Sequence, residues 1–235
     1  TSSQKLKAEL SVKELRTACQ NCDFTNLEII NAENDTVEFK ADFIADGYLQ
    51  QIYEKSIFIK ENDEWKYDSG ELFDVFIEIS PAQGPVKYEF CKENGHLRVD
   101  RFLQTAMAYP CNYGYIPQTL SDDGDPADVL VLAPFPLVTG SVVRCRPIGV
   151  LEMDDEAGGD AKILAVPVEK LTKFYNNVND IGDVQQEMLD KIGHFFEHYK
   201  DLEKGKWVKV KGWAGKEVAR KEIIESAERY QNTLK

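Results

Sequence analysis

Near residue 72 the sequence changes to short apolar runs that proline and glycine interrupt: FDVFIEISPAQGPVKYEF, VLVLAPFPL, SVVRCRPIGVLEM and KILAVPV. Many short strands with turn signals between them predict a small barrel rather than a doubly wound sheet. Two helical stretches follow, DVQQEMLDKIGHFFEHYKDLEKG, which Gly205 is expected to close, and KEVARKEIIESAERYQNTL, with the strand-like WVKVKGW between them. We therefore expect a mainly β fold with flanking helices, of the α+β class.

The preceding residues have a different pattern. Residues 4–20 carry apolar side chains at helical spacing, including Leu6, Leu10 and Leu15. Residues 25–70 alternate apolar and polar side chains in three runs, with turns at AENDT, ADG and ENDE, which is typical of an antiparallel meander. Catalytic residue types do not gather here. The sequence predicts two domains, a small α+β segment of unknown role over 1–70 and a second domain over 71–235.

Charge and composition narrow the classes of function. Asp and Glu number 41 against 28 Lys and Arg, a net charge of −13. A nucleic-acid surface needs a basic face, so DNA and RNA are disfavoured as partners. No stretch approaches the ~20 apolar residues of a membrane span, and TSSQKLKAELSVKEL lacks the apolar core of a secretion signal, so we expect a cytoplasmic protein. The five cysteines are irregularly spaced, which argues against a disulfide scaffold.

The acidic residues gather in two patches. The first, SDDGDPAD, ends at Asp128, and the second, MDDEAGGDAK, contains Asp155 and Asp160. Each patch lies beside a strand-like run, so both fit one rim of a barrel. Oxygen-only clusters suit Mg²⁺, Mn²⁺ or Ca²⁺ rather than zinc or copper. Solvated turns are the plain alternative; the residue order of an EF-hand is absent.

Basic and phenolic residues accompany the acids, among them Lys87, Arg101, Tyr113, Tyr199 and Lys200. Arg binds phosphate oxygens through a planar fork, Lys as a point charge and Tyr through its hydroxyl. Cations together with these donors describe a phosphoryl-transfer site, where catalysis consists mostly of positioning and charge neutralisation.

The motifs DGDPADVLVL, VFIEIS, VKYEF, VDRF, AMAYPCNYGYIPQT, GSVVRCRPIGVLEMDDEAGGDAKILAVP and HFFEHYKDLEKGKWVKVKGW stand together in this order. With them the chain, from about Phe73 to its C-terminus, resembles the family I soluble inorganic pyrophosphatases of bacteria. The resemblance implies a five-stranded, OB-like barrel with flanking helices and Mg²⁺-dependent hydrolysis of diphosphate, with several ions per site and Mn²⁺ as a substitute. It also implies diphosphate entering as its magnesium complex, and a homohexamer.

The resemblance also assigns roles by position. It implies six metal-binding carboxylates, the two glutamates acting through water: Asp123, Asp128, Asp155, Asp160, Glu89 and Glu78. It implies six diphosphate-binding residues: Lys87, Arg101, Tyr113, Lys162, Tyr199 and Lys200. Asp125 stands where the family places its general base. A water shared by two cations would then lose its proton to Asp125 and attack one phosphorus in line.

Parts of the sequence also fit other interpretations. HFFEH, from His194 to His198, matches the H-x-x-E-H pattern of some zinc proteases, although the resemblance places this helix at a subunit contact. A non-enzymatic OB-type binding module would need basic, aromatic strands, and the charge points the other way. Residues 25–70 weakly resemble the C-terminal strands of a bacterial family with SEC-C zinc motifs and a cone-like, nuclear-transport-factor type of fold. A fusion whose N-terminal segment is an unrelated domain is a further alternative.

Overall fold

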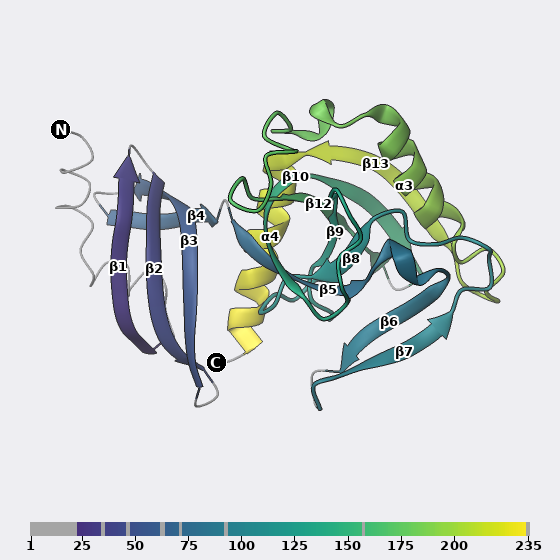
Figure 1. Cartoon of the computed structure of the whole chain (residues 1–235), viewed down its shortest axis with the longest axis horizontal. Coiled ribbons are helices and arrows are strands. Elements are labelled where there is room, and N and C mark those ends of the chain that lie inside the picture. Colours follow the sequence, from purple (N-terminus) through teal and green to yellow (C-terminus); the bar gives the residue numbers. More distant parts are fainter. Residues whose placement is uncertain are drawn as a thin grey trace. The chain divides into compact units, whose positions relative to one another are not determined.

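A computed structural model of the chain describes residues 23–33, 36–45, 48–61, 64–70, 72–91, 94–156 and 158–233. The chain divides into two compact units, Thr1–Leu72 and Phe73–Lys235, which we call the N-terminal unit and the barrel unit (Figure 1). The helix expected over residues 4–20 lies outside the described residues. No helix in the described part of the chain is both long and apolar enough to cross a membrane.

The N-terminal unit contains an antiparallel sheet in the order β1 (Asp23–Glu33), β2 (Thr36–Ala45), β3 (Tyr48–Glu61) and β4 (Glu64–Gly70). Neighbours in sequence are neighbours in the sheet, as a meander requires. The sequence predicted three strands in this sheet, and the structure has four. The strand that was not expected is β4, whose short sequence EWKYDSG has too little apolar character to stand out as a strand.

The barrel unit is a closed ring of five strands. Its members are β5 (Phe73–Ile79), β8 (Asn112–Tyr115), β9 (Asp128–Val131), β12 (Lys162–Pro167) and β10 (Val142–Asp155), and β10 pairs back to β5. Only the β9–β12 pair within this ring is parallel. The five-stranded barrel expected from the sequence is therefore confirmed.

The long strand β10 organises the barrel unit. Its first residues pair with β5, its middle with β12, and its end with β13 (Val208–Gly215) and the short β11 (Gly158–Gly159). One strand of 14 residues thus joins the ring to the outer strand β13. Its last residue is Asp155, so the second acidic patch lies where the strand leaves the ring.

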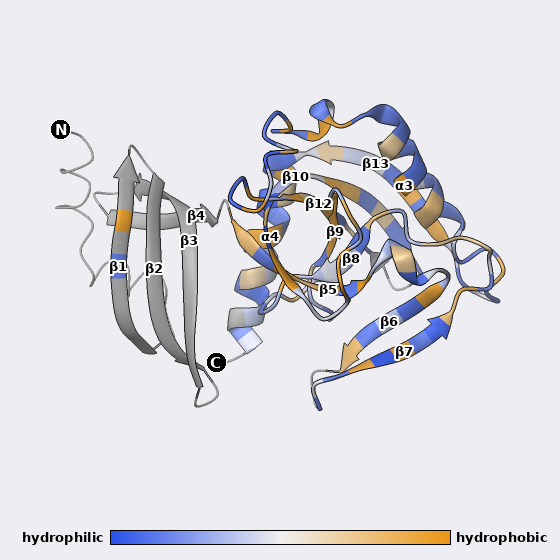
Figure 2. Ribbon diagram, in the orientation of Figure 1, coloured by the Kyte–Doolittle hydropathy of each residue, from blue (hydrophilic) through white to orange (hydrophobic). Residues whose placement is uncertain are grey.

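Both faces of the ring strands are buried. Along β9, Val129 and Val131 pack in one apolar cluster, whereas Leu130 packs in another. Strand β12 divides in the same way, with Ile163 in the first cluster and Leu164 in the second. Strands buried on both faces have continuous apolar runs, which explains VLVL in the sequence and the orange colour along β9 and β12 in Figure 2.

Two helices complete the barrel unit. Helix α3 (Gln186–His198) packs Leu189, Ile192, Phe195 and Phe196 into the cluster that contains Leu130. Helix α4 (Lys216–Thr233) contacts β10 and β13 and places Ala219 in the other cluster. Single-turn 3₁₀ segments lie at Pro81–Gln83 and Ile181–Asp183. The expected closure of the first helix at Gly205 was wrong. The helix ends at His198, and Gly205, at φ +80°, lies in the last of the turns that follow, where the Lys206 N–H donates to the Glu203 carbonyl.

A two-stranded ribbon, β6 (Val86–Cys91) and β7 (His96–Phe102), forms a sheet of its own. Figure 1 shows it extending away from the ring. The Phe90 N–H donates to Glu78 of β5 over 2.7 Å, and the Phe90 and Phe76 rings lie 4.7 Å apart. The ribbon is thereby attached to the ring at the strand that carries Glu78.

Candidate active site

The parallel β9–β12 pair sets the centre of the site. Its register places Lys162 opposite Asp128, and the Lys162 ammonium bonds both Asp128 and Asp160. The Lys162 residue is 3 % exposed. Burial by itself would lower the pKa of Lys162, but the two carboxylates outweigh it and raise that pKa. The lysine is therefore a charged group held between two acids.

The neighbouring carboxyl groups repel one another, which affects their pKa values. Burial raises the pKa of Asp160, Lys162 opposes this, and Asp128 adds to it. Burial and the Asp128 charge also raise the pKa of Asp123. Because carboxylates this close repel one another, additional positive charge would be stabilised here.

A short loop carries Asp123 and Asp125. The Ser121 N–H donates to the Asp125 carbonyl over 2.6 Å, and the Asp125 N–H donates to the Asp123 carboxylate over 3.0 Å. Gly124 has φ +90°, a conformation that glycine adopts without strain. These bonds fix the loop, and the exposed Asp125 lies within it.

Helix α4 is hydrogen-bonded to Leu120, the residue just before this loop. The Leu120 N–H donates to the Ser226 carbonyl over 2.8 Å, and Arg229 Nε donates to the Leu120 carbonyl over 2.7 Å. Arg229 also lies 3.4 Å from Asp122 and 3.0 Å from Glu222. The C-terminal helix therefore helps to set the position of the acidic loop.

The second acidic patch is paired with the segment after α3. Lys200, which is buried, donates to Asp155 over 2.8 Å and lies 3.6 Å from Glu156. Lys206 also pairs with Glu156. The end of β10 and the turn after α3 are thus joined by opposite charges.

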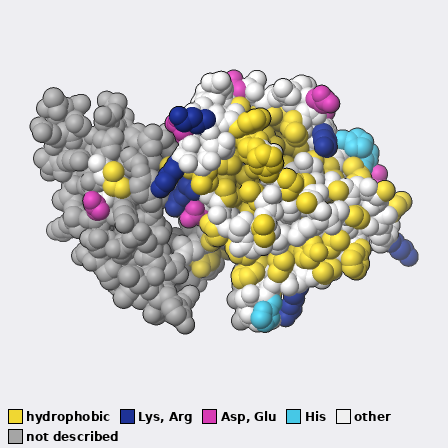
Figure 3. Space-filling view, viewed as in Figure 1, with side chains coloured by type: hydrophobic (Ala, Val, Ile, Leu, Met, Phe, Trp, Pro, Cys, Tyr) yellow, Lys and Arg dark blue, Asp and Glu magenta, His cyan; other side chains and the backbone are white. Residues whose placement is uncertain are grey.

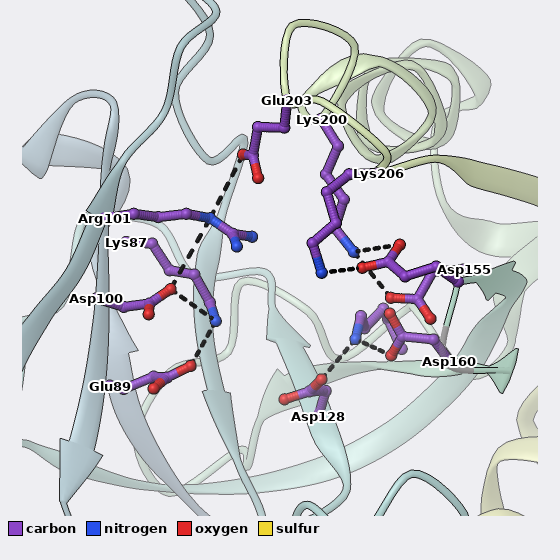
Figure 4. A network of polar contacts seen from close by, with 12 residues as sticks. Lys87, Glu89, Asp100, Arg101, Asp128, Asp155, Asp160, Lys200, Glu203 and Lys206 are labelled. Carbon is purple, nitrogen blue, oxygen red and sulfur yellow. Dashed lines mark hydrogen bonds and ion pairs between the residues drawn. The ribbon is translucent and has the colours of Figure 1, made fainter.

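The ribbon contributes a third group of charges. Lys87 Nζ lies 2.6 Å from Glu89 and 3.3 Å from Asp100, and Arg101 Nε lies 3.4 Å from Glu203. Figure 4 shows these ribbon residues facing Asp128, Asp155, Asp160 and Lys200 from the other side of the site. The ribbon therefore brings its two basic residues toward the acidic centre.

Glu78 lies between the ribbon and the ring. Its side chain on β5 is buried, and its Oε1 accepts the Phe90 N–H. Burial raises the pKa of Glu78 to about 7, the Phe90 hydrogen bond opposes the rise, and the nearby Asp128 adds to it. Burial therefore favours the neutral form of this carboxyl.

The two predicted phenolic donors lie inside the fold. Tyr113 of β8 and Tyr199 after α3 are both buried, and Tyr199 stacks on Phe195 with ring centroids 5.2 Å apart. Burial raises the pKa of both hydroxyls above the usual range, and Asp128 raises that of Tyr113 further. Both side chains stay neutral hydrogen-bond donors at ordinary pH.

The predicted site residues thus come from all five ring strands, both ribbon strands, two loops and the turn after α3. Three of the predicted metal ligands, Asp123, Asp128 and Asp160, line one cavity of about 170 Å³. Among the described residues, no three acid, histidine or cysteine side chains converge tightly enough to form a ready-made metal site. The acidic centre is instead bridged by Lys162. Glu89 lies at the exposed edge, paired with Lys87.

Two participants were missed by sequence reasoning, Glu203 and Lys206. Both lie in the segment after α3, and their partners are distant in sequence: Arg101 on β7 and Glu156 directly after β10. Since no local pattern links such segments, the sequence carries no signal for either contact. In the alternative zinc motif, the His194 and His198 rings are 4.5 Å apart, and His198 pairs with Asp201 at 2.9 Å. No third zinc ligand joins them among the described residues.

Comparison with known proteins covers both units. The family profile described as Inorganic pyrophosphatase matches residues 75–231, and the one described as YchJ, middle NTF2-like domain, matches residues 1–70. The chain is 60 % identical over 162 residues to the inorganic pyrophosphatase of Xanthomonas campestris pv. campestris, covering 69 % of this chain and 91 % of that protein. It is 61 % identical over 158 residues to the inorganic pyrophosphatase of Escherichia coli K12, covering 67 % of this chain and 90 % of that protein.

Solved structures give the same result. An inorganic pyrophosphatase from Coxiella burnetii matches with a TM-score of 0.67 and 53 % identity, covering 68 % of this chain and 95 % of that one. The inorganic pyrophosphatase from Thermus thermophilus matches with a TM-score of 0.65 and 44 % identity, covering 68 % of this chain and 92 % of that one. The matched profile, residues 75–231, includes every candidate site residue from Glu78 to Lys200.

Proposed function

The chain belongs to the inorganic pyrophosphatase family, and its barrel unit is an inorganic diphosphatase. We propose that it hydrolyses diphosphate with Mg²⁺ and the residues named above. The observation that carries the proposal is the acidic centre, where Lys162 bridges Asp128 and Asp160 beside Asp123. The alternative of a non-enzymatic OB-type module is set aside by the family membership.

The residues present fit a hard cation. The donor set is carboxylate oxygen only, which suits Mg²⁺ and Mn²⁺. Burial and mutual repulsion raise the pKa values of Asp123 and Asp160, so a cation relieves an existing cost. Asp123, Asp128, Asp155 and Asp160 would hold the ions directly, and Glu78 and Glu89 through water. Bound Mg²⁺ supplies a water of lowered pKa and neutralises phosphate charge.

The basic residues have two sets of partners in this proposal. Lys162 and Lys200 pair with carboxylates in the structure. Once those carboxylates are committed to cations, the ammonium groups become available to donate to phosphate oxygens. Lys87 and Arg101 approach from the ribbon and oppose the negative charge that develops on the leaving phosphate. Tyr113 and Tyr199 add neutral donors.

Asp125 is the proposed general base. Its carboxylate is exposed in a loop whose backbone is fixed by Ser121 and Asp123, so it can accept a proton from a water at the acidic centre. The net charge of −13 repels free diphosphate, and we infer that the substrate is its magnesium complex.

Phosphate release from diphosphate tests the proposal. We expect turnover with Mg²⁺, weaker activity with Mn²⁺, and none in a chelator. Asp125→Asn should lower kcat by about 100-fold or more while metal binding, measured by calorimetry, is kept. Asp122→Asn, in the same loop, is the matched control and should retain turnover. An inactive purified chain at saturating Mg²⁺ contradicts the function, and a near-normal D125N removes Asp125 from the base role.

Two further expectations stay proposals. A homohexamer follows from the family resemblance and is tested by light scattering of the full chain. The barrel unit exposes large apolar side chains such as Phe135, Val138 and Phe174, and Figure 3 shows apolar side chains gathered on its visible face. Such surface favours association. The cytoplasmic location remains a prediction, and residues 1–70 have no assigned role.

A further inference from the structure

Glu203 is the acid that reaches Arg101 from outside the ribbon. Glu203 Oε1 lies 3.4 Å from Arg101 Nε, whereas the nearest Asp100 oxygen lies 3.8 Å from that nitrogen. The Glu203 side chain is 10 % exposed. Both atoms of the Glu203 contact are buried without a hydrogen-bond partner. The pair is therefore held by charge attraction rather than by a directed bond.

The backbone connects Glu203 to a substrate-binding candidate. The Glu203 N–H donates to the Lys200 carbonyl over 2.8 Å, so both residues belong to one turn after α3. The Lys200 side chain bonds Asp155 at the end of β10. One turn thus holds Arg101 of the ribbon through Glu203, and the ring through Lys200.

The position of Glu203 leaves the far edge of the guanidinium free for a ligand. Figure 4 shows the terminal nitrogens of Arg101 pointing toward the side of Lys200 and Lys206, while Glu203 approaches the Nε side. Arginine binds a phosphate best when two of its N–H groups face it together. A carboxylate at Nε presents the terminal nitrogens to such an oxyanion.

Asp100 is the competing partner of Arg101. It already lies 3.3 Å from Lys87, and it sits one residue before Arg101 on β7. Without a negative charge at position 203, the guanidinium would be drawn back to Asp100 along the ribbon, away from the turn that carries Lys200. The charge of Glu203 therefore opposes the attraction of Arg101 to Asp100.

We propose that Glu203 is a positioning residue that aims Arg101 at diphosphate and sets its separation from Lys200. This inference rests on the proposed diphosphate site. It assigns Glu203 no contact with substrate. It predicts an effect on substrate binding that passes entirely through Arg101.

The test uses the full chain with Mg²⁺. Glu203→Gln keeps the shape and removes the charge. We expect KM for magnesium diphosphate to rise about tenfold, because charge-assisted contacts to phosphate are weakened, with kcat changed less than about threefold. Binding of inorganic phosphate, measured by calorimetry without turnover, should weaken in parallel. Glu203→Asp keeps the charge and should recover part of the loss.

Two controls separate positioning from a structural effect. Asp201→Asn removes another carboxylate of the same segment, one that pairs with His198, and should leave KM unchanged. In an Arg101→Gln background, Glu203→Gln should raise KM no further. Additive effects on KM, or a loss of thermal stability with unchanged KM, overturn the inference. An inactive wild-type chain overturns the proposed function instead.

Discussion

At the scale of single residues, Lys162 acts as an internal counter-charge. It is almost fully buried, and its ammonium bonds two acids that the proposed function assigns to metal ions. A buried charge that loses its partner is far more costly than an exposed one. The metal-free protein should therefore depend on this lysine more than the metal-bound protein does.

Lys162→Met tests that dependence. In a chelator we expect the free energy of unfolding to fall by about 3 to 5 kcal/mol, because two carboxylates are left without their counter-charge. Added Mg²⁺ should restore part of the loss, as measured by urea unfolding. Lys211→Met is the control. Lys211 pairs with Asp154 but is half exposed, so the expected loss is under about 1 kcal/mol. Equal losses for the two variants would show that burial at Lys162 has no special cost.

Glu78 gives a pH dependence of the metal-free protein. Its pKa is raised from 4.5 to about 7 in the fold, so between these values the folded state holds a proton that the unfolded state has lost. Stability therefore falls as pH rises through this window, by roughly 3 kcal/mol in total. Glu78→Gln should remove this slope in unfolding measured from pH 4.5 to 7.5. If the free energy of unfolding of Glu78→Gln falls with pH as steeply as that of the wild type, another group is responsible for the titration.

At the scale of elements, the close pairing of β5 and β8 requires glycine at position 114. A Cβ added at Gly114 would lie 1.9 Å from the Phe76 carbonyl oxygen, which is backbone and cannot rotate away. The two strands of the ring would have to separate. Tyr113, the residue before Gly114 on β8, pairs with Ile79 of β5.

Gly114→Ala should therefore destabilise the barrel unit by about 3 kcal/mol, at the upper end of overpacking effects. Gly193→Ala is the control: this position in α3 has no atom near the added Cβ, so we expect a gain of about 0.5 to 1 kcal/mol. Thermal and urea unfolding measure both. If Gly114→Ala is tolerated as well as Gly193→Ala, the strands are not held this closely.

The sequence predicted the elements better than their partners. Apolar runs identified β5, β9, β10 and β12, because a buried face leaves a local pattern, whereas β4 and β8 were not recognised as strands. The pairing of β10 with β5, β12 and β13 left no such pattern, since it joins distant segments. The same holds within the site. Asp123, Asp128 and Asp160 stand in motifs, but the bridge that Lys162 makes between two of them, and the Arg101–Glu203 pair, depend on register and on a turn.

At the scale of the whole molecule, the two units match different families, with residues 1–70 outside the pyrophosphatase match. The first ring strand begins at Phe73, and we propose that the units are independent domains. Limited proteolysis of the full chain should cut between residues 68 and 74 and leave a C-terminal fragment with normal phosphate release. Mass spectrometry identifies the cut. Loss of activity on cleavage there, with the fragment still folded, would mean that the N-terminal unit contributes to catalysis.

The closure of the ring through β5 and β10 bears on how the chain folds. Val75 pairs with Val143, and β12 must be present before β9 and β10 are joined. Contacts between such distant residues slow folding, because the intervening chain must be ordered before they form. The meander β1–β4 pairs only neighbours in sequence and should form sooner. During synthesis, the barrel therefore cannot close until Pro167 has left the ribosome.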